Sequence, residues 1–127
     1  MQGKAKILVV DDDEDLCYII TRTLEKMGYE VLAVASGPEA ILAMTSQRFC
    51  LALVDINTPD VKRREAILRM RQYDPQMPVV LMTGSPGWPD AELQMTCQER
   101  LHMPFRLEEL RSIVKSALGE SNRLPTF

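Results

Sequence analysis

The chain has 127 residues, enough for one ordinary domain with a single core, and its 46% hydrophobic and 26% charged residues exclude a disordered chain. Its formal net charge of −3 gives no reason to expect nucleic-acid binding by this chain alone. No apolar stretch is long enough to cross a membrane, and the start "MQGKAK" lacks the apolar core of a signal peptide. The three widely spaced cysteines, Cys17, Cys50 and Cys97, favour a reduced, cytoplasmic setting.

The chain opens with a short apolar strand followed by a helix. The run "KILVV" at 6–10 is β-branched and predicts a buried strand. Apolar residues then recur with helical spacing over 16–27, and Gly28 stands where a glycine usually ends a helix. The run "YEVLAVA" at 29–35 predicts the second strand.

The same alternation continues through the middle of the chain. Ser36 and Glu39 form a capping box that opens a second helix reaching Met44. The run at 50–56, "CLALVDI", is a third strand and is too apolar to have one exposed face. A third helix is predicted over roughly 64–73, because it stops before Asp74-Pro75.

The last third of the chain predicts two strands and two helices. The run "MPVVLMT" at 77–83 is the fourth strand. The prolines in "TGSPGWPD" (83–90) predict a fourth helix that begins late and is short. A weaker strand at 99–103 precedes an amphipathic helix over 107–118.

This order of elements predicts an α/β fold. Five strand–helix units, (βα)5, imply a doubly wound parallel five-stranded sheet with helices on both faces, in strand order 2-1-3-4-5. We assign residues 1–119 to this domain and residues 120–127, "ESNRLPTF", to a polar tail or linker stub.

Acidic residues follow the predicted central strands. Asp11 and Asp12 come directly after the first strand, Asp55 lies at the end of the third, and Thr83 ends the fourth. Because these strands are neighbours in the predicted order, the side chains should meet at one edge of the sheet. Such an oxygen-rich pocket suits Mg²⁺, and a carboxylate beside the ion can accept a phosphoryl group. The alternative is that the residues from Asp11 to Asp15 only favour the start of the first helix.

The chain resembles the receiver domains of two-component response regulators. The likeness runs through "ILVVDDDEDL", "LVDINTP", "VVLMTG" and "MPF" followed by "EEL", in the same order and spacing. It implies a flavodoxin-like fold and a phosphoprotein that signals and is not an enzyme, beyond self-phosphorylation and autodephosphorylation. Its expected partner is a histidine kinase or a phosphotransfer protein, with a downstream partner that the sequence does not name.

The resemblance also implies a role for individual residues. Asp11, Asp12 and Asp55 would hold Mg²⁺ together with the backbone carbonyl of Asn57, and Asp55 would become an aspartyl phosphate. Thr83 would donate a hydrogen bond to the phosphoryl group and move on activation. Two prolines also match the family, Pro59 after the acceptor and Pro104, which often follows a cis peptide.

Several positions depart from the family pattern. The usual site lysine is Met103, which carries no charge and no hydrogen-bond donor, and the usual aromatic switch residue is Arg100. The Asp-Gly that often begins the third helix is Lys62-Arg63. We expect the basic run at 62–64 to be a solvated helix start, although Lys62, Arg63, Arg100 or Arg106 could replace the missing charge. Trp88 is either a partner contact or packs over its loop.

Three functions are compatible with this pattern. The first is phosphorylation at Asp55 with altered signal transmission, and the second is a pseudo-receiver that binds partners whatever its phosphate state. The third is a phosphohydrolase of the haloacid-dehalogenase type, which needs a second aspartate as general acid where this chain has Asn57. A zinc or Ser-His site has little support, because His102 is the single histidine and no CxxC pair is present.

Overall fold

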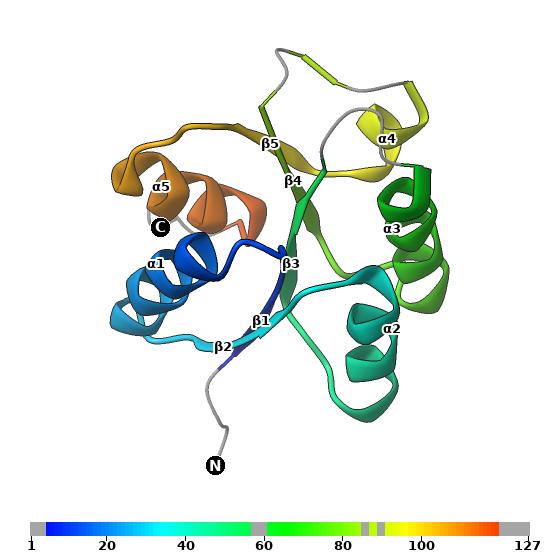
Figure 1. Ribbon diagram of the computed structural model, residues 1–127, viewed down its shortest axis with the longest axis horizontal. Helices are drawn as coiled ribbons and strands as arrows, with labels where there is room; N and C mark the ends of the chain where they lie inside the picture. The colour runs from blue at the N-terminus through cyan, green and yellow to red at the C-terminus, as the bar shows by residue number, and fades with distance from the viewer. Residues whose placement is uncertain (1–4, 57–60, 85–86, 89–90, 120–127) are drawn as a thin grey trace, which may run out of the picture.

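The computed structural model describes residues 5–56, 61–84, 87–88 and 91–119. Its five strands form one parallel sheet in the order β2-β1-β3-β4-β5, so the predicted fold class and topology are confirmed (Figure 1). In chain order the elements are β1 (Lys6–Val10), α1 (Glu14–Lys26), β2 (Glu30–Val34), α2 (Gly37–Ser46), β3 (Leu51–Asp55), α3 (Val61–Tyr73), β4 (Val79–Thr83), α4 (Ala91–Thr96), β5 (Glu99–His102) and α5 (Leu107–Ala117).

Helices cover both faces of the sheet and leave its central strands buried. Figure 1 shows α1 and α5 on one face and α2, α3 and α4 on the other. Alternate residues of each strand enter the two cores: Leu8 and Val10 of β1 join the α2–α3 side, while Ile7 and Val9 join the α1–α5 side. Every residue of β3 and β4 is buried, which confirms the prediction that the third strand has no exposed face and extends it to the fourth.

Local chemistry sets the ends of the first two helices. Asp13 caps α1, where its Oδ1 accepts a hydrogen bond from the Leu16 N–H at 3.2 Å. Gly28 follows α1 with a φ of 100°, a left-handed conformation that glycine adopts without strain. Ser36 caps α2 by accepting from the Glu39 N–H, and its hydroxyl donates to the Glu39 carboxylate.

The helices α2 and α3 approach each other closely. Gly37, the first residue of α2, lies against Ala66 of α3, and a Cβ atom added at Gly37 would lie 2.5 Å from the Cβ of Ala66. No ordinary contact between two carbon atoms is that short. The absence of a side chain at Gly37 is therefore what allows this pair of helices to pack.

Two helix boundaries test the sequence predictions. The helix α4 spans only Ala91–Thr96, so the prediction of a late, short helix is confirmed. The helix α3 begins at Val61, three residues earlier than predicted. Lys62 and Arg63 favour helix, but they add no apolar residue to the pattern from which the start was predicted.

The proposed tail at 120–127 lies outside the described residues. In the part of the chain that is described, no helix is long and apolar enough to cross a membrane.

Candidate functional site

The strand ends bring three carboxylates together. Asp11 follows β1 and Asp55 ends β3, and the two strands pair with Val10 opposite Val54. Asp11, Asp12 and Asp55 each place one carboxylate oxygen within 4.8 Å of those of the other two. The structure thus confirms that these three residues converge.

Burial makes this cluster electrostatically costly. Asp11 is 4% exposed and Asp55 is 6% exposed, whereas Asp12 is open to solvent. Burial raises the pKa of Asp11, as do the charges of Asp13 and Asp12, while the Asp13 N–H and the Arg63 charge act in the opposite direction. The predicted crowding of negative charge is therefore present at the end of β1.

The donor set fits a hard divalent cation. Oδ1 of Asp11 accepts a hydrogen bond from the Asp13 N–H at 2.9 Å, but its buried Oδ2 has no hydrogen-bond partner among the described residues. Burying a carboxylate oxygen without a hydrogen-bond partner costs free energy of folding unless a cation or a water molecule binds to it. Oxygen ligands of this kind are those that Mg²⁺ prefers. Asn57 and Pro59, the other predicted residues of this loop, lie outside the described residues.

Thr83 and Met103 lie on the neighbouring strands. Thr83 is fully buried one residue beyond Met82, the register partner of Asp55, so it stands beside the end of β3. Its carbonyl accepts a hydrogen bond from the Met103 N–H at 2.8 Å. The Met103 side chain packs against the α1–α5 core, and the Met103–Pro104 peptide is cis, as the family resemblance implies.

Arg100 of β5 contacts Trp88, which lies in the loop between β4 and α4. The Arg100 guanidinium carbon lies 6.0 Å from the centre of the Trp88 ring, within the range of a cation–π interaction. The Nε atom of Arg100 is buried and has no hydrogen-bond partner among the described residues. Trp88 itself packs against the α2–α3 core. Trp88 is half-buried and therefore packs within the molecule, against this core and beside Arg100.

The basic run at the start of α3 is only partly solvated, because Arg63 bonds to the backbone of the sheet whereas Arg64 makes a surface ion pair. Lys62 is exposed. Arg63 donates from Nη1 to the carbonyl oxygen of Asp55 at 2.7 Å and to that of Val10 at 3.3 Å. Arg64 pairs with Glu92 of α4. In the sequence, Arg63 could be singled out because Lys62-Arg63 replaces the Asp-Gly pair that often begins the third helix in this family.

A thiol lies beside the acidic cluster and was missed by sequence reasoning. The Sγ of Cys17 donates to the carbonyl oxygen of Asp11 at 3.2 Å. Burial, together with the charges of the surrounding aspartates, raises the pKa of Cys17 to about 11. This thiol is therefore protonated at neutral pH. Its position one turn into α1, after an acidic loop, is the sequence signal that could have found it.

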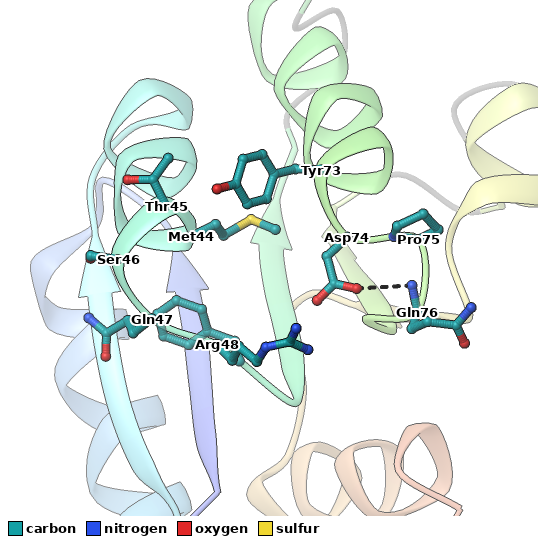
Figure 2. A pocket seen from close by; sticks show the side chains of 10 residues that line it. Met44, Thr45, Ser46, Gln47, Arg48, Tyr73, Asp74, Pro75 and Gln76 are labelled. Carbon is teal, nitrogen blue, oxygen red and sulfur yellow. Dashed lines mark hydrogen bonds between the residues drawn. The ribbon is translucent and has the colours of Figure 1, made fainter.

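A separate pocket lies far from the acidic cluster. It has a volume of about 560 Å³ and is formed where α2 and α3 end, with Met44 and Tyr73 on its walls (Figure 2). Figure 2 also shows the Asp74 carboxylate accepting a hydrogen bond from the Gln76 N–H in the loop before β4. Because these loops enter β3 and β4, the pocket is at the opposite end of the sheet from Asp55.

Comparisons with known proteins agree on one family. The family model described as "Response regulator receiver domain" matches residues 7–115. The transcriptional regulatory protein YkoG of Bacillus subtilis is 31% identical over 120 residues, which cover 93% of this chain and 53% of YkoG. This chain therefore spans about half the length of the curated relatives it matches.

Solved structures agree with the sequence comparison. The receiver domain from Methanospirillum hungatei has a TM-score of 0.82 and 27% identity, with 92% of this chain and 95% of that one covered. The response regulator TrrA of Thermotoga maritima, solved in complex with Mg²⁺ and BeF, has a TM-score of 0.78 and 25% identity, covering 89% of this chain and 98% of that one. The chain belongs to the response regulator receiver domain family, the signalling domains of two-component systems.

Proposed function

We propose that Asp55 accepts a phosphoryl group from a histidine kinase or a phosphotransfer protein in a Mg²⁺-dependent reaction. The observation that carries this proposal is the convergence of three carboxylates, two of them buried, at the ends of β1 and β3. Such a cluster of carboxylates is unfavourable by itself, and a bound cation relieves its repulsion and offsets the negative charge that a phosphoryl group adds.

The transfer needs a nucleophile and a way to tolerate added charge. A carboxylate oxygen of Asp55 attacks phosphorus, an O–P bond forms, and the bond from phosphorus to the donor's leaving group breaks with its electron pair going to that group. The hydroxyl of Thr83, at the end of the adjacent strand, donates a hydrogen bond to a phosphoryl oxygen.

Asp11, Asp12 and Asp55, with the backbone carbonyl of Asn57, are the residues that would hold the metal. Bound Mg²⁺ supplies charge neutralisation between the carboxylates and the anionic donor. The two carboxylate oxygens of Asp11 then have different roles, because the Asp13 N–H fixes Oδ1 and leaves the buried Oδ2 for the metal. Residues 1–119 act as the signalling domain, in the cytoplasm, with residues 120–127 as a tail or linker.

A second candidate is a pseudo-receiver whose partner binding ignores phosphate. Met103 and Arg100 favour it, because they replace the lysine and the aromatic switch residue that the family resemblance implies. Arg100 is instead placed over Trp88. Partner affinity that is the same for wild type and Asp55→Asn, with or without a phosphodonor, would support this candidate over switching.

The experiment is phosphorylation by a small donor. Wild type and Asp55→Asn are incubated with acetyl phosphate, each with Mg²⁺ and with EDTA, and the intact masses are measured. We expect one added phosphoryl group on wild type with Mg²⁺ only, and none on Asp55→Asn. Equal labelling of both proteins would remove Asp55 from the proposal.

A further inference from the structure

The start of α3 places an arginine at the edge of the sheet that carries the acidic cluster. Arg63 donates from Nη1 to the carbonyl oxygens of Asp55 (2.7 Å) and Val10 (3.3 Å), and its Nη2 lies 3.5 Å from that of Ala35. These three carbonyls belong to the ends of β3 and β1 and to the residue after β2. A single guanidinium therefore spans three adjacent strands, and two of them carry the carboxylates of the site.

This location is unusual for a cation. The first turn of a helix carries the positive end of the helix dipole and favours acidic residues, yet the first turn of α3 has none. The contacts that stabilise Arg63 there include the row of carbonyl oxygens and the negative charge of Asp11. Its charge already acts on Asp11, since it opposes the rise in the pKa of that carboxyl group.

The other cations considered for this role are engaged elsewhere or exposed. Lys62 is open to solvent, Arg100 lies over Trp88, and Arg106 is exposed at the start of α5. Met103, at the usual lysine position, packs into the α1–α5 core. Within the described part of the chain, Arg63 is the candidate whose guanidinium is bonded to the ends of the strands that form the site.

We propose that Arg63 is the positioning cation of this receiver site: it holds the ends of β1 and β3 and supplies, from the α3 side, the fixed positive charge that Met103 cannot. The inference rests on the proposed function, because it concerns the same phosphoryl site. It assigns the charge to a helix on the opposite face of the sheet from the core in which Met103 packs.

A fixed charge has opposite effects on ligands of opposite sign, which separates it from a purely structural role. The Asp55 carboxylate lies within about 5 Å of its own carbonyl oxygen by covalent geometry, so Nη1 of Arg63, which lies 2.7 Å from that carbonyl oxygen, is at most about 8 Å from the carboxylate. At such a distance a partly screened charge should strengthen the binding of the singly charged phosphoryl mimic beryllofluoride by about ten-fold and weaken the binding of divalent Mg²⁺ by more than that. A role confined to holding the strands would change both affinities in the same direction.

The experiment compares Arg63→Gln with Arg69→Gln by titration calorimetry. Arg69 lies further along the same helix, so the control removes the same charge away from the site. Mg²⁺ is titrated first, and beryllofluoride is then titrated at saturating Mg²⁺. We expect Arg63→Gln to bind beryllofluoride about ten-fold more weakly and Mg²⁺ more than ten-fold more tightly, and Arg69→Gln to match wild type.

A second variant keeps the test valid if Arg63→Gln unfolds. Arg63→Lys retains the charge but loses the planar fork that spans the carbonyls, so both ligand affinities should stay within about three-fold of wild type even if its melting temperature falls. The inference is overturned if Arg63→Gln weakens both ligands, if neither affinity changes, or if Arg63→Lys behaves like Arg63→Gln. A wild-type protein that binds neither ligand overturns the proposed function, and this inference with it.

Discussion

The buried carboxylate of Asp11 should destabilise the metal-free protein, and Asp11→Asn should relieve that cost. Asp11 and Asp55 are both almost fully buried, and their nearest suitable oxygens lie within 4.8 Å. Two unit charges at that separation repel by roughly 3.5 kcal/mol at an effective dielectric constant of about 20. The Arg63 charge and the solvent beside exposed Asp12 reduce this repulsion. We therefore expect Asp11→Asn to raise the free energy of unfolding by about 1–2 kcal/mol in EDTA.

The sign of the pH dependence follows from the raised pKa of Asp11. Because folding raises this pKa above its ordinary value of 3.8, protonated Asp11 favours the folded state at low pH. That contribution is lost as the pH rises through the folded-state pKa, and above it the charged form is destabilising. The advantage of Asp11→Asn should therefore be present at pH 7 and disappear as the pH falls to the ordinary range of a carboxyl group.

The assay is urea unfolding of both proteins, in EDTA and then in Mg²⁺. At Mg²⁺ concentrations about ten times the dissociation constant, wild type should gain about 1.4 kcal/mol, and Asp11→Asn should gain much less. Asp15→Asn is the matched control, since Asp15 is exposed in the first turn of α1. Its loss should cost about 0.3–1 kcal/mol through the helix dipole. An Asp11→Asn protein that is less stable than wild type in EDTA would refute this reasoning.

Three further predictions concern the thiol, the helix contact and the missing lysine. Because the pKa of Cys17 is raised to about 11, its thiol should be alkylated slowly at pH 8, and faster when Mg²⁺ neutralises the nearby carboxylates. Peptide mass spectrometry would measure both rates, and an alkylation rate that does not respond to Mg²⁺ would contradict this prediction. Gly37→Ala should lower the free energy of unfolding in urea by about 1–3 kcal/mol, and the added substitution Ala66→Gly should recover part of that loss. A Gly37→Ala protein as stable as wild type would show that α2 and α3 can move apart without cost. Met103→Lys should strengthen beryllofluoride binding by less than the roughly 1.5–3 kcal/mol of a new charge-assisted hydrogen bond, because Arg63 already supplies positive charge to the site, and a gain of that full size would contradict this role of Arg63.

The sequence predicted the sheet well because its signals were long and redundant. Five apolar runs alternate with helical patterns, and the fully apolar character of β3 and β4 marks strands buried on both faces. The convergence of Asp11, Asp12 and Asp55 followed from topology alone, since the carboxyl ends of neighbouring parallel strands share one edge.

The contacts that the sequence did not specify depend on how separate elements lie relative to one another. Nothing in the spacing of Lys62, Arg63 and Arg64 distinguishes a residue that faces solvent from one whose guanidinium reaches three strand ends. The contact between Arg100 and Trp88 joins a strand to a loop in the same way. The close approach of Gly37 to Ala66 likewise needs the relative placement of two helices, which no local pattern specifies.

The most direct test of the proposed phosphotransfer identifies the residue that carries the phosphoryl group. Wild-type protein is phosphorylated with acetyl phosphate and Mg²⁺, the acyl phosphate is reduced with borohydride, and the modified residue is located by peptide mass spectrometry. We predict that the side chain of Asp55 alone is reduced, to the corresponding alcohol, and that omission of Mg²⁺ abolishes the reaction. Reduction at Asp11, Asp12 or Asp13 instead, or labelling that does not need Mg²⁺, would contradict the proposal.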